Sequence, residues 1–202
     1  MNRFYQGFGS IFCWLIVIFL TGCATTYEAA KIDSNLNVAG YEKLNRAGNH
    51  EAVIKYNGQM SGDALVLGIY GSAHTYKYDF SPYLEDAIEQ VLNKVYQSVK
   101  VNDGNSLETP SGVGIIRIEF AEPNVRLNCF IESQIKGNCV SVSKMTATVT
   151  TPMGDVREIL IKEEEASQAQ SLYQGGPKAI SASVGASINS FSDQLYGILS
   201  SY

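Results

Sequence analysis

Two stretches of the chain repeat their apolar residues every three or four positions, the spacing that places them on one side of an α-helix. The first stretch follows Ser81-Pro82, a serine that can cap a helix and a proline suited to its first turn. The second follows the interruption at Gly175-Gly176-Pro177. The spacing predicts two helices, each with one apolar stripe. The stripes are Leu84, Ala87, Ile88, Val91, Leu92, Val95 and Val99 in the first helix, and Ile180, Val184, Ile188, Phe191, Leu195 and Leu199 in the second.

Other segments alternate apolar and polar residues or accumulate β-branched ones, and both patterns are typical of strands. Within residues 139–151 the apolar positions change parity at Ser143-Lys144, which predicts a β-bulge or bend because one extra residue turns later side chains to the other face. The apolar residues concerned are Val140 and Val142 on one side and Met145, Ala147 and Val149 on the other. The predicted strands cover residues 64–70, 76–80, 113–120, 125–131, 139–151 and 156–161.

This order of elements predicts an α+β fold, in which an antiparallel sheet of four to five strands is covered on one face by two helices. We expect one such domain over residues 61–202. Residues 23–60 begin with small and polar residues and are interpreted as a tether. Within them, residues 41–59 are compatible with one or two short helical turns.

The N-terminus has the three parts of a secretory signal. Residues 1–10 carry Arg3 and no acid, residues 11–20 are continuously apolar, and small residues follow. The apolar core is about half the length that a transmembrane helix needs. The sequence Leu20-Thr21-Gly22-Cys23 resembles the lipobox of bacterial lipoproteins.

The lipoprotein resemblance implies that residues 1–22 are removed as a signal peptide and that the sulfur of Cys23 carries covalent acyl chains, such as palmitate. Two or more chains hold a protein lastingly at a membrane. Residue 24 is alanine and not aspartate, the pattern of lipoproteins sorted to the outer membrane in Gram-negative bacteria. The resemblance therefore implies a periplasmic domain anchored to that membrane.

Charge and length narrow the possible functions. The formal net charge is −5, and it becomes −6 when Arg3 leaves with the signal peptide. The remaining chain is long enough for one domain with a substantial core. The basic residues are scattered, so neither nucleic acid nor an anionic membrane surface is an expected electrostatic partner.

Two cysteines, Cys129 and Cys139, remain after Cys13 is removed and Cys23 is lipidated. An oxidising compartment favours a disulfide between them. A metal site needs more ligands, and the only histidines, His50 and His74, are distant in sequence. We therefore predict a disulfide, with no metal and no other cofactor.

Candidate catalytic residues do not form a recognisable site. Ser141 and Lys144 fit the S-x-x-K pattern of penicillin-binding proteins, but in a predicted strand residues three apart point to opposite faces. His74 is expected in a surface loop, and His50 at a turn or helix start. No catalytic residue is assigned, and the chain is not expected to be an enzyme.

Four tyrosines, Tyr70, Tyr76, Tyr78 and Tyr83, lie close together in the sequence. They can cover the core at a sheet edge, or they can form a contact surface for a partner, because tyrosine combines a large rigid area with a polar tip. The sequence leaves both interpretations open.

The functional hypothesis is a membrane-anchored, non-enzymatic lipoprotein that docks onto cell-envelope machinery or helps to assemble it, through a protein partner in the envelope. The alternative is a periplasmic carrier of a lipid or another small apolar ligand. A deep apolar pocket would favour the carrier, and an exposed contact surface would favour docking.

Overall fold

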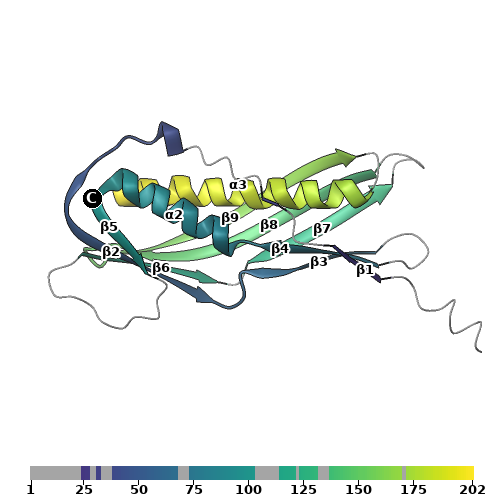
Figure 1. Ribbon diagram of the computed structural model, residues 1–202, viewed down its shortest axis with the longest axis horizontal. Coiled ribbons are helices and arrows are strands. Elements are labelled where there is room, and N and C mark those ends of the chain that lie inside the picture. The colour runs from purple at the N-terminus through teal and green to yellow at the C-terminus, as the bar shows by residue number, and fades with distance from the viewer. Residues whose placement is uncertain are drawn as a thin grey trace, which may run out of the picture.

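The computed structural model describes residues 24–27, 31–32, 38–67, 73–102, 114–121, 123–131, 137–169 and 172–202. The described chain is elongated, with β1 at one end and the C-terminus at the other (Figure 1). Its elements are, in order, β1 Ala24–Tyr27, the 3₁₀ turn Val38–Gly40, β2 Arg46–Asn57, β3 Ser61–Leu67, β4 Ala73–Asp79, α2 Ser81–Val95, β5 Tyr96–Asn102, β6 Gly114–Ala121, β7 Asn124–Ile131, β8 Gly137–Thr150, β9 Val156–Ala169 and α3 Leu172–Ser200.

The larger sheet is organised around β8. This strand pairs with β9 along one edge and with β6 and β7, one after the other, along the opposite edge, and all three pairings are antiparallel. β2 continues the sheet beyond β6, and β5 lies beyond β2; both of these pairings are parallel. The fold is therefore α+β with a mostly antiparallel sheet, as predicted, but this sheet has six strands and includes parallel pairs that the sequence analysis did not anticipate.

A smaller sheet has the order β1-β4-β3, with β1 parallel to β4 and β3 antiparallel to it. β3 lies beside β7 of the larger sheet. The chain leaves the larger sheet for the smaller one at Gly58, which has a φ of 115°, and Pro123 separates β6 from β7 within the larger sheet. Glycine tolerates that backbone conformation and proline has no N–H for a ladder, so each residue favours a break in a long strand.

The two helices pack differently. α3 lies along β8 and β9, whereas α2 packs against α3 and β5 (Figure 1). Both predicted stripes are buried, except for Val99, which lies beyond α2. Phe120 of β6 and Phe191 of α3 contact each other in the core, with ring centroids 5.1 Å apart.

Residues 38–57 belong to the folded domain, which corrects the predicted tether over residues 23–60. The segment predicted to form helical turns contains β2, a strand with neighbours on both sides and with Ala52 and Ile54 buried. The residues before it are fixed to α3: Tyr41 stacks on Tyr196 with ring centroids 4.5 Å apart and donates a 2.6 Å hydrogen bond to Asp193 Oδ1. The apolar run of β2 is too short for periodicity to distinguish a buried strand from a helix.

Both helix boundaries differ from the predictions. α2 ends at Val95 and the chain continues directly as β5, because the edge of β2 offers backbone hydrogen bonds there. α3 begins at Leu172, so the Gly-Gly-Pro sequence lies inside its start and does not precede it. Gly176 permits close contact with the sheet, since a Cβ on it would lie 2.9 Å from Tyr76 Cζ.

β8 contains no bulge, which corrects the expectation at Ser143-Lys144. Its register with β9 is unbroken from Gly137 to Thr150, and Ser141 and Ser143 are buried on the same face as Met145. These serines bond to serines of α3: Ser141 Oγ lies 2.8 Å from Ser183 Oγ, and Ser187 donates a 2.9 Å hydrogen bond to Ser143. Residues two apart in a strand are separated by about 6.6 Å, and residues four apart in a helix by about 6 Å. The two serines of β8 and the two serines of α3 therefore have nearly the same spacing, so both pairs can form together.

Truncation of the two β8 serines to alanine should lower stability by different amounts. Ser183 also donates to the carbonyl of Ile180, whereas no second bond is found for Ser187 in the described residues. Ser143→Ala should therefore cost about 1–3 kcal/mol by leaving a buried hydroxyl unpaired, and Ser141→Ala should cost less. Urea unfolding measures both values.

The double variant Ser143→Ala with Ser187→Ala removes both partners, so it should be no less stable than Ser143→Ala alone. Equal losses for Ser141→Ala and Ser143→Ala would contradict this account of the two pairs.

Candidate functional surface

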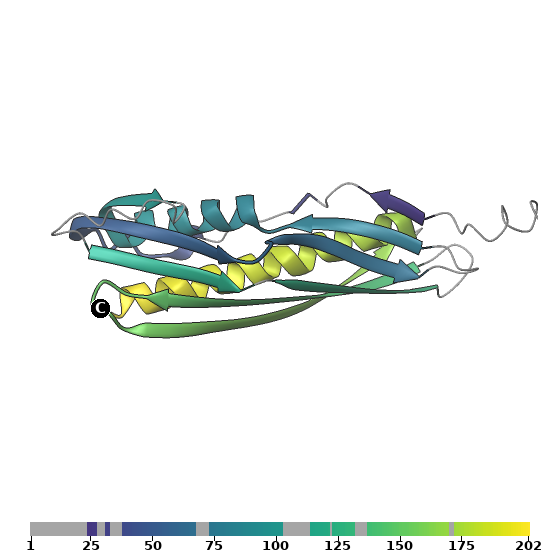
Figure 2. The same cartoon turned by 90° about the horizontal axis from the view of Figure 1, so that it is seen from below.

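The start of β1 defines one end of the domain. Ala24, which follows Cys23 directly in the sequence, pairs with Ala73 of β4. Cys23 itself, like the rest of the predicted lipobox, lies outside the described residues. Because Ala24 is bonded to Cys23, the predicted lipid is attached where β1 begins. The ends of β3, β7 and β9 and the start of α3 lie at this same end, which we call the anchor end (Figures 1 and 2).

Two large apolar side chains are exposed near the anchor end. Leu65 of β3 is 57% exposed and Phe130 of β7 is 62% exposed. A depression of about 300 Å³ lies between their strands, lined by Leu65, Val66, Leu127, Asn128, Cys129 and Phe130. Exposed apolar residues that cluster in this way are typical of surfaces that bind a protein or a membrane.

A disulfide joins Cys129 of β7 to Cys139 of β8, as the sequence predicts. The two residues are direct cross-strand partners with their Cα atoms 4.1 Å apart. Cys139 is fully buried, and Cys129 is followed by the exposed Phe130. The bond therefore ties together the two strands that carry part of the apolar surface at the anchor end.

Of the two interpretations of the tyrosine cluster, the structure favours the core for Tyr76 and Tyr78. Tyr76 and Tyr78 are only 1% and 7% exposed, so they belong to the core, and Tyr70 lies outside the described residues. Tyr83 is partly buried, and its hydroxyl accepts a hydrogen bond from the backbone N–H of Ile32. Glycines leave room for both buried rings: a Cβ on Gly62 would be 2.5 Å from the Tyr78 hydroxyl. The strict alternation of residues 76–80 was the signal for burial, because it places every ring on one covered face.

The two histidines lie in strands, which corrects both predictions. His74 is buried in β4 opposite Val66 and does not lie in a surface loop. His50 is part of β2, where its ring packs against Tyr96 with centroids 4.0 Å apart. Burial lowers the pKa of His50, so its neutral form is favoured. Among the described residues, no group of three or more His, Cys, Asp or Glu is placed to hold a metal ion.

Ser141 and Lys144 point to opposite faces of β8. Ser141 is buried against α3, while Lys144 is exposed. The serine–lysine chemistry needs both groups on the same side. The S-x-x-K residues therefore do not meet in this structure.

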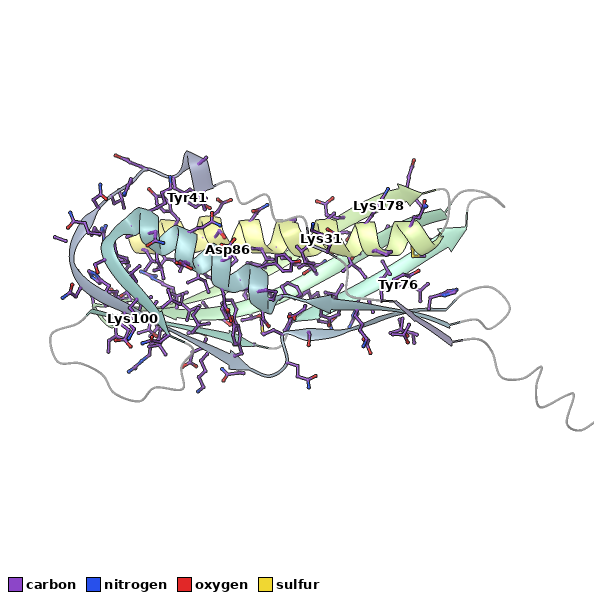
Figure 3. The ribbon with its side chains drawn as sticks, viewed as in Figure 1. Lys31, Tyr41, Tyr76, Asp86, Lys100 and Lys178 are labelled. Carbon is purple, nitrogen blue, oxygen red and sulfur yellow. A yellow bond between two sulfur atoms is a disulfide. The ribbon has the colours of Figure 1, made fainter. Side chains whose placement is uncertain are left out.

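An open groove of about 560 Å³ lies beside the first half of α3, where Figure 3 labels Lys31 and Lys178. It is lined by Lys31, Pro177, Lys178, Ser181 and Ala182, and Ser181 donates a 2.8 Å hydrogen bond to the carbonyl of Lys31. None of these polar side chains is buried. Small-molecule sites combine enclosure with fixed polar groups, and this groove has neither feature.

Known proteins resemble the chain in structure and not in sequence. Its sequence matches no protein-family model and no curated protein. Rare lipoprotein B from Shewanella oneidensis is similar in structure at 8% identity, with a TM-score of 0.41, over 75% of this chain and 95% of that one. A minor lipoprotein from Acinetobacter baumannii is similar at 10% identity, with a TM-score of 0.39, over 75% of this chain and 90% of that one.

A protein from Xanthomonas campestris shows a similar level of likeness. It is 10% identical, with a TM-score of 0.39, over 86% of this chain and 93% of its own. TM-scores this low assign neither a family nor an activity. Within the described residues, neither helix combines the length and the apolar character required to cross a bilayer.

Proposed function

We propose that this chain is a lipid-anchored protein of the bacterial cell envelope that works by binding other envelope components and not by catalysis. The observation that carries the proposal is the position of the predicted lipidation site. Cys23 ends a lipobox-like sequence, and the folded domain begins with β1 at the very next residue. Under the lipoprotein resemblance, Ala24 favours the periplasmic face of the outer membrane.

A lipid at this position would hold the domain close to the bilayer. Few residues separate Cys23 from the folded core, because β1 pairs with β4 and Ile32 is buried. A short attachment confines the domain to a thin layer and raises its effective concentration for partners in the same membrane. The proposal therefore replaces a domain on a long tether with one held against the membrane.

Exposed apolar residues on the face of the sheets turned away from α3 support docking as the mode of action. Leu65 and Phe130 lie near the anchor end, and Val156 and Leu160 lie on β9. Ile159 and Ile161, which alternate with Leu160, are buried on the α3 side of the same strand. A surface with large exposed apolar side chains fits a protein partner better than a ligand enclosed in the core.

Substitution of Cys23 tests the anchor. In the native host, Cys23→Ser should leave an uncleaved precursor that takes up no labelled fatty acid, because serine provides no thiol for the acyl transfer. Cys13→Ser is the matched control, since Cys13 lies within the predicted signal peptide and should be lost on processing. Mass spectrometry of the N-terminus and fatty-acid labelling measure both outcomes. Normal acylation of the Cys23→Ser protein would refute the anchor.

A further inference from the structure

β9 is a long strand with one open edge. Figure 2 shows it as the outermost strand of the larger sheet. One edge pairs with β8 from Val156 to Ala169, and within the described residues no strand pairs with the other. The strand contains no proline and its register has no break. Such an edge presents unpaired backbone N–H and C=O groups that can accept another strand.

The side chains of β9 are unusual for an exposed edge. Val156 is 62% exposed and Leu160 is 67% exposed on the face turned away from α3. Glu158 and Lys162, which flank Leu160 on that face, are exposed as well. The exposed face of β9 therefore carries, in order, a negative, an apolar and a positive side chain. A neighbouring strand that presents a positive, an apolar and a negative side chain at the facing positions would complement it.

β9 itself supplies that reverse order. Consider a second copy related by a two-fold axis that runs through Leu160 at right angles to the sheet. Antiparallel pairing then places each Glu158 opposite the other copy's Lys162, with Leu160 opposite Leu160. Opposite charges in direct cross-strand positions stabilise a sheet.

The face toward α3 matches in the same register, since Arg157 comes opposite Glu163. Arg157 also interacts with Tyr202 in its own chain, so this pair is the weaker part of the match.

Neighbouring registers do not match. Residues directly opposite each other in an antiparallel pair point to the same face of the sheet, and successive residues of a strand alternate between faces. The two-fold axis must therefore lie at a residue position and cannot lie midway between two successive residues. An axis through Ile161 would place Glu158 opposite Glu164. An axis through Ile159 would place Glu158 opposite Leu160. Only the axis through Leu160 pairs the charges and also joins the two exposed leucines.

We propose that β9 is a self-association surface, through which two copies of this chain pair their β9 edges antiparallel about Leu160. The interface is isologous, as in most soluble homodimers. It buries Leu160 and extends the larger sheet across both chains. The anchor ends of the two copies lie at opposite ends of the dimer. Rotation about the two-fold axis does not change a position measured along that axis, so both anchor ends lie in one plane perpendicular to it. A single membrane at right angles to the axis can therefore hold both lipids.

Cysteine crosslinking in native membranes tests the register directly. Residues in direct antiparallel positions have Cα atoms about 4.5–5.5 Å apart, which is within the range of a disulfide. Leu160→Cys should give a covalent dimer on mild oxidation, seen on a non-reducing gel. Val156→Cys is the matched control, because in this register it faces Glu164 and not itself.

A crosslink from Leu160→Cys to a different protein would overturn self-association. Absence of any crosslink would overturn it too.

Charge reversal provides a second, independent test on the purified full-length protein in mild detergent. Glu158→Lys places two like-charged pairs in the interface, so it should weaken dimerisation by about tenfold or more in analytical ultracentrifugation. Lys162→Glu should do the same, and the double variant Glu158→Lys with Lys162→Glu should restore the dimer.

Glu164→Lys controls for net charge, because Glu164 faces Val156 and its reversal should not weaken the dimer. All three positions are at the surface, and circular dichroism checks that each variant is folded. A monomeric parent protein, or a double variant as weak as the single ones, would overturn the proposal. These outcomes are separate from lipidation, which the Cys23 experiment measures.

Discussion

Tyr76→Ala should lower the free energy of unfolding by about 3–5 kcal/mol, the usual cost of truncating a buried aromatic residue. The ring is almost completely buried in β4, and it lies against Gly176 of α3. Its removal leaves a cavity where the helix approaches the sheet closely. A loss of this size is a large part of the total stability of about 5–15 kcal/mol that is typical of native proteins. Thermal and urea unfolding of the purified protein measure it.

Phe130→Ala is the matched control for Tyr76→Ala. Both changes remove an aromatic ring from a strand, but Phe130 is mostly exposed, so its loss should alter stability by no more than about 0.5 kcal/mol. If Tyr76→Ala kept full stability and lost only its envelope partners, Tyr76 would belong to a contact surface after all, contrary to its position here. Loss of partners by Phe130→Ala at unchanged stability would instead support the apolar surface near the anchor end.

Removal of the disulfide, by Cys129→Ala with Cys139→Ala, should cost about 3 kcal/mol of stability through the loss of loop closure in the unfolded chain. The bond closes a short loop, since its cysteines are separated by 10 positions. The effect should be concentrated at the anchor end, where the bond ties β7 to β8. Urea unfolding of the parent and the variant gives the difference.

A reducing agent supplies the control for the disulfide. It should bring the parent protein close to the stability of the double variant and leave the double variant unchanged. Two titratable thiols in the denatured, non-reduced parent protein would contradict the bond. Hydrogen exchange should show the greatest loss of protection in β7 and the adjoining part of β8, because local opening follows the weakest contacts.

The stability predictions and the functional proposals concern different parts of the molecule. The core between the helices and the sheet contains Tyr76 and Tyr78, two of the four tyrosines considered as a contact surface. The exposed apolar residues lie elsewhere, near the anchor end and on β9. A variant in the core should therefore act on folding, and a variant on the exposed face should act on binding, so the two classes can be separated experimentally.

Local patterns in the sequence were enough to predict both helices, their buried faces and several of the strands. The stripe from Leu84 to Val95 is buried as a unit, because residues three and four apart always share a side of a helix, whatever the helix packs against. The cysteine pair and the alternation around Tyr76 and Tyr78 are local signals as well. These features depend on spacing along the chain, which the sequence contains in full.

Other features depend on partners that are distant in the sequence, and only the tertiary structure decided them. Ser141 and Ser143 are buried because Ser183 and Ser187 of α3 satisfy their hydroxyls, so a polar residue at these positions does not indicate an exposed face. β5 is a strand because β2 provides the edge that it pairs with.

The candidate functional surfaces also include features that the sequence predicts and features that only the tertiary structure decides. The lipobox is a continuous motif, so the sequence alone predicts where a lipid would be attached. That β1 pairs with β4 directly after the predicted lipidation site, and that β9 has an open edge among the described residues with Leu160 between two opposite charges, follow from strand pairing. Strand order is set by contacts between segments far apart in the chain, and no local pattern of apolar and polar residues encodes which strand will be the last in a sheet.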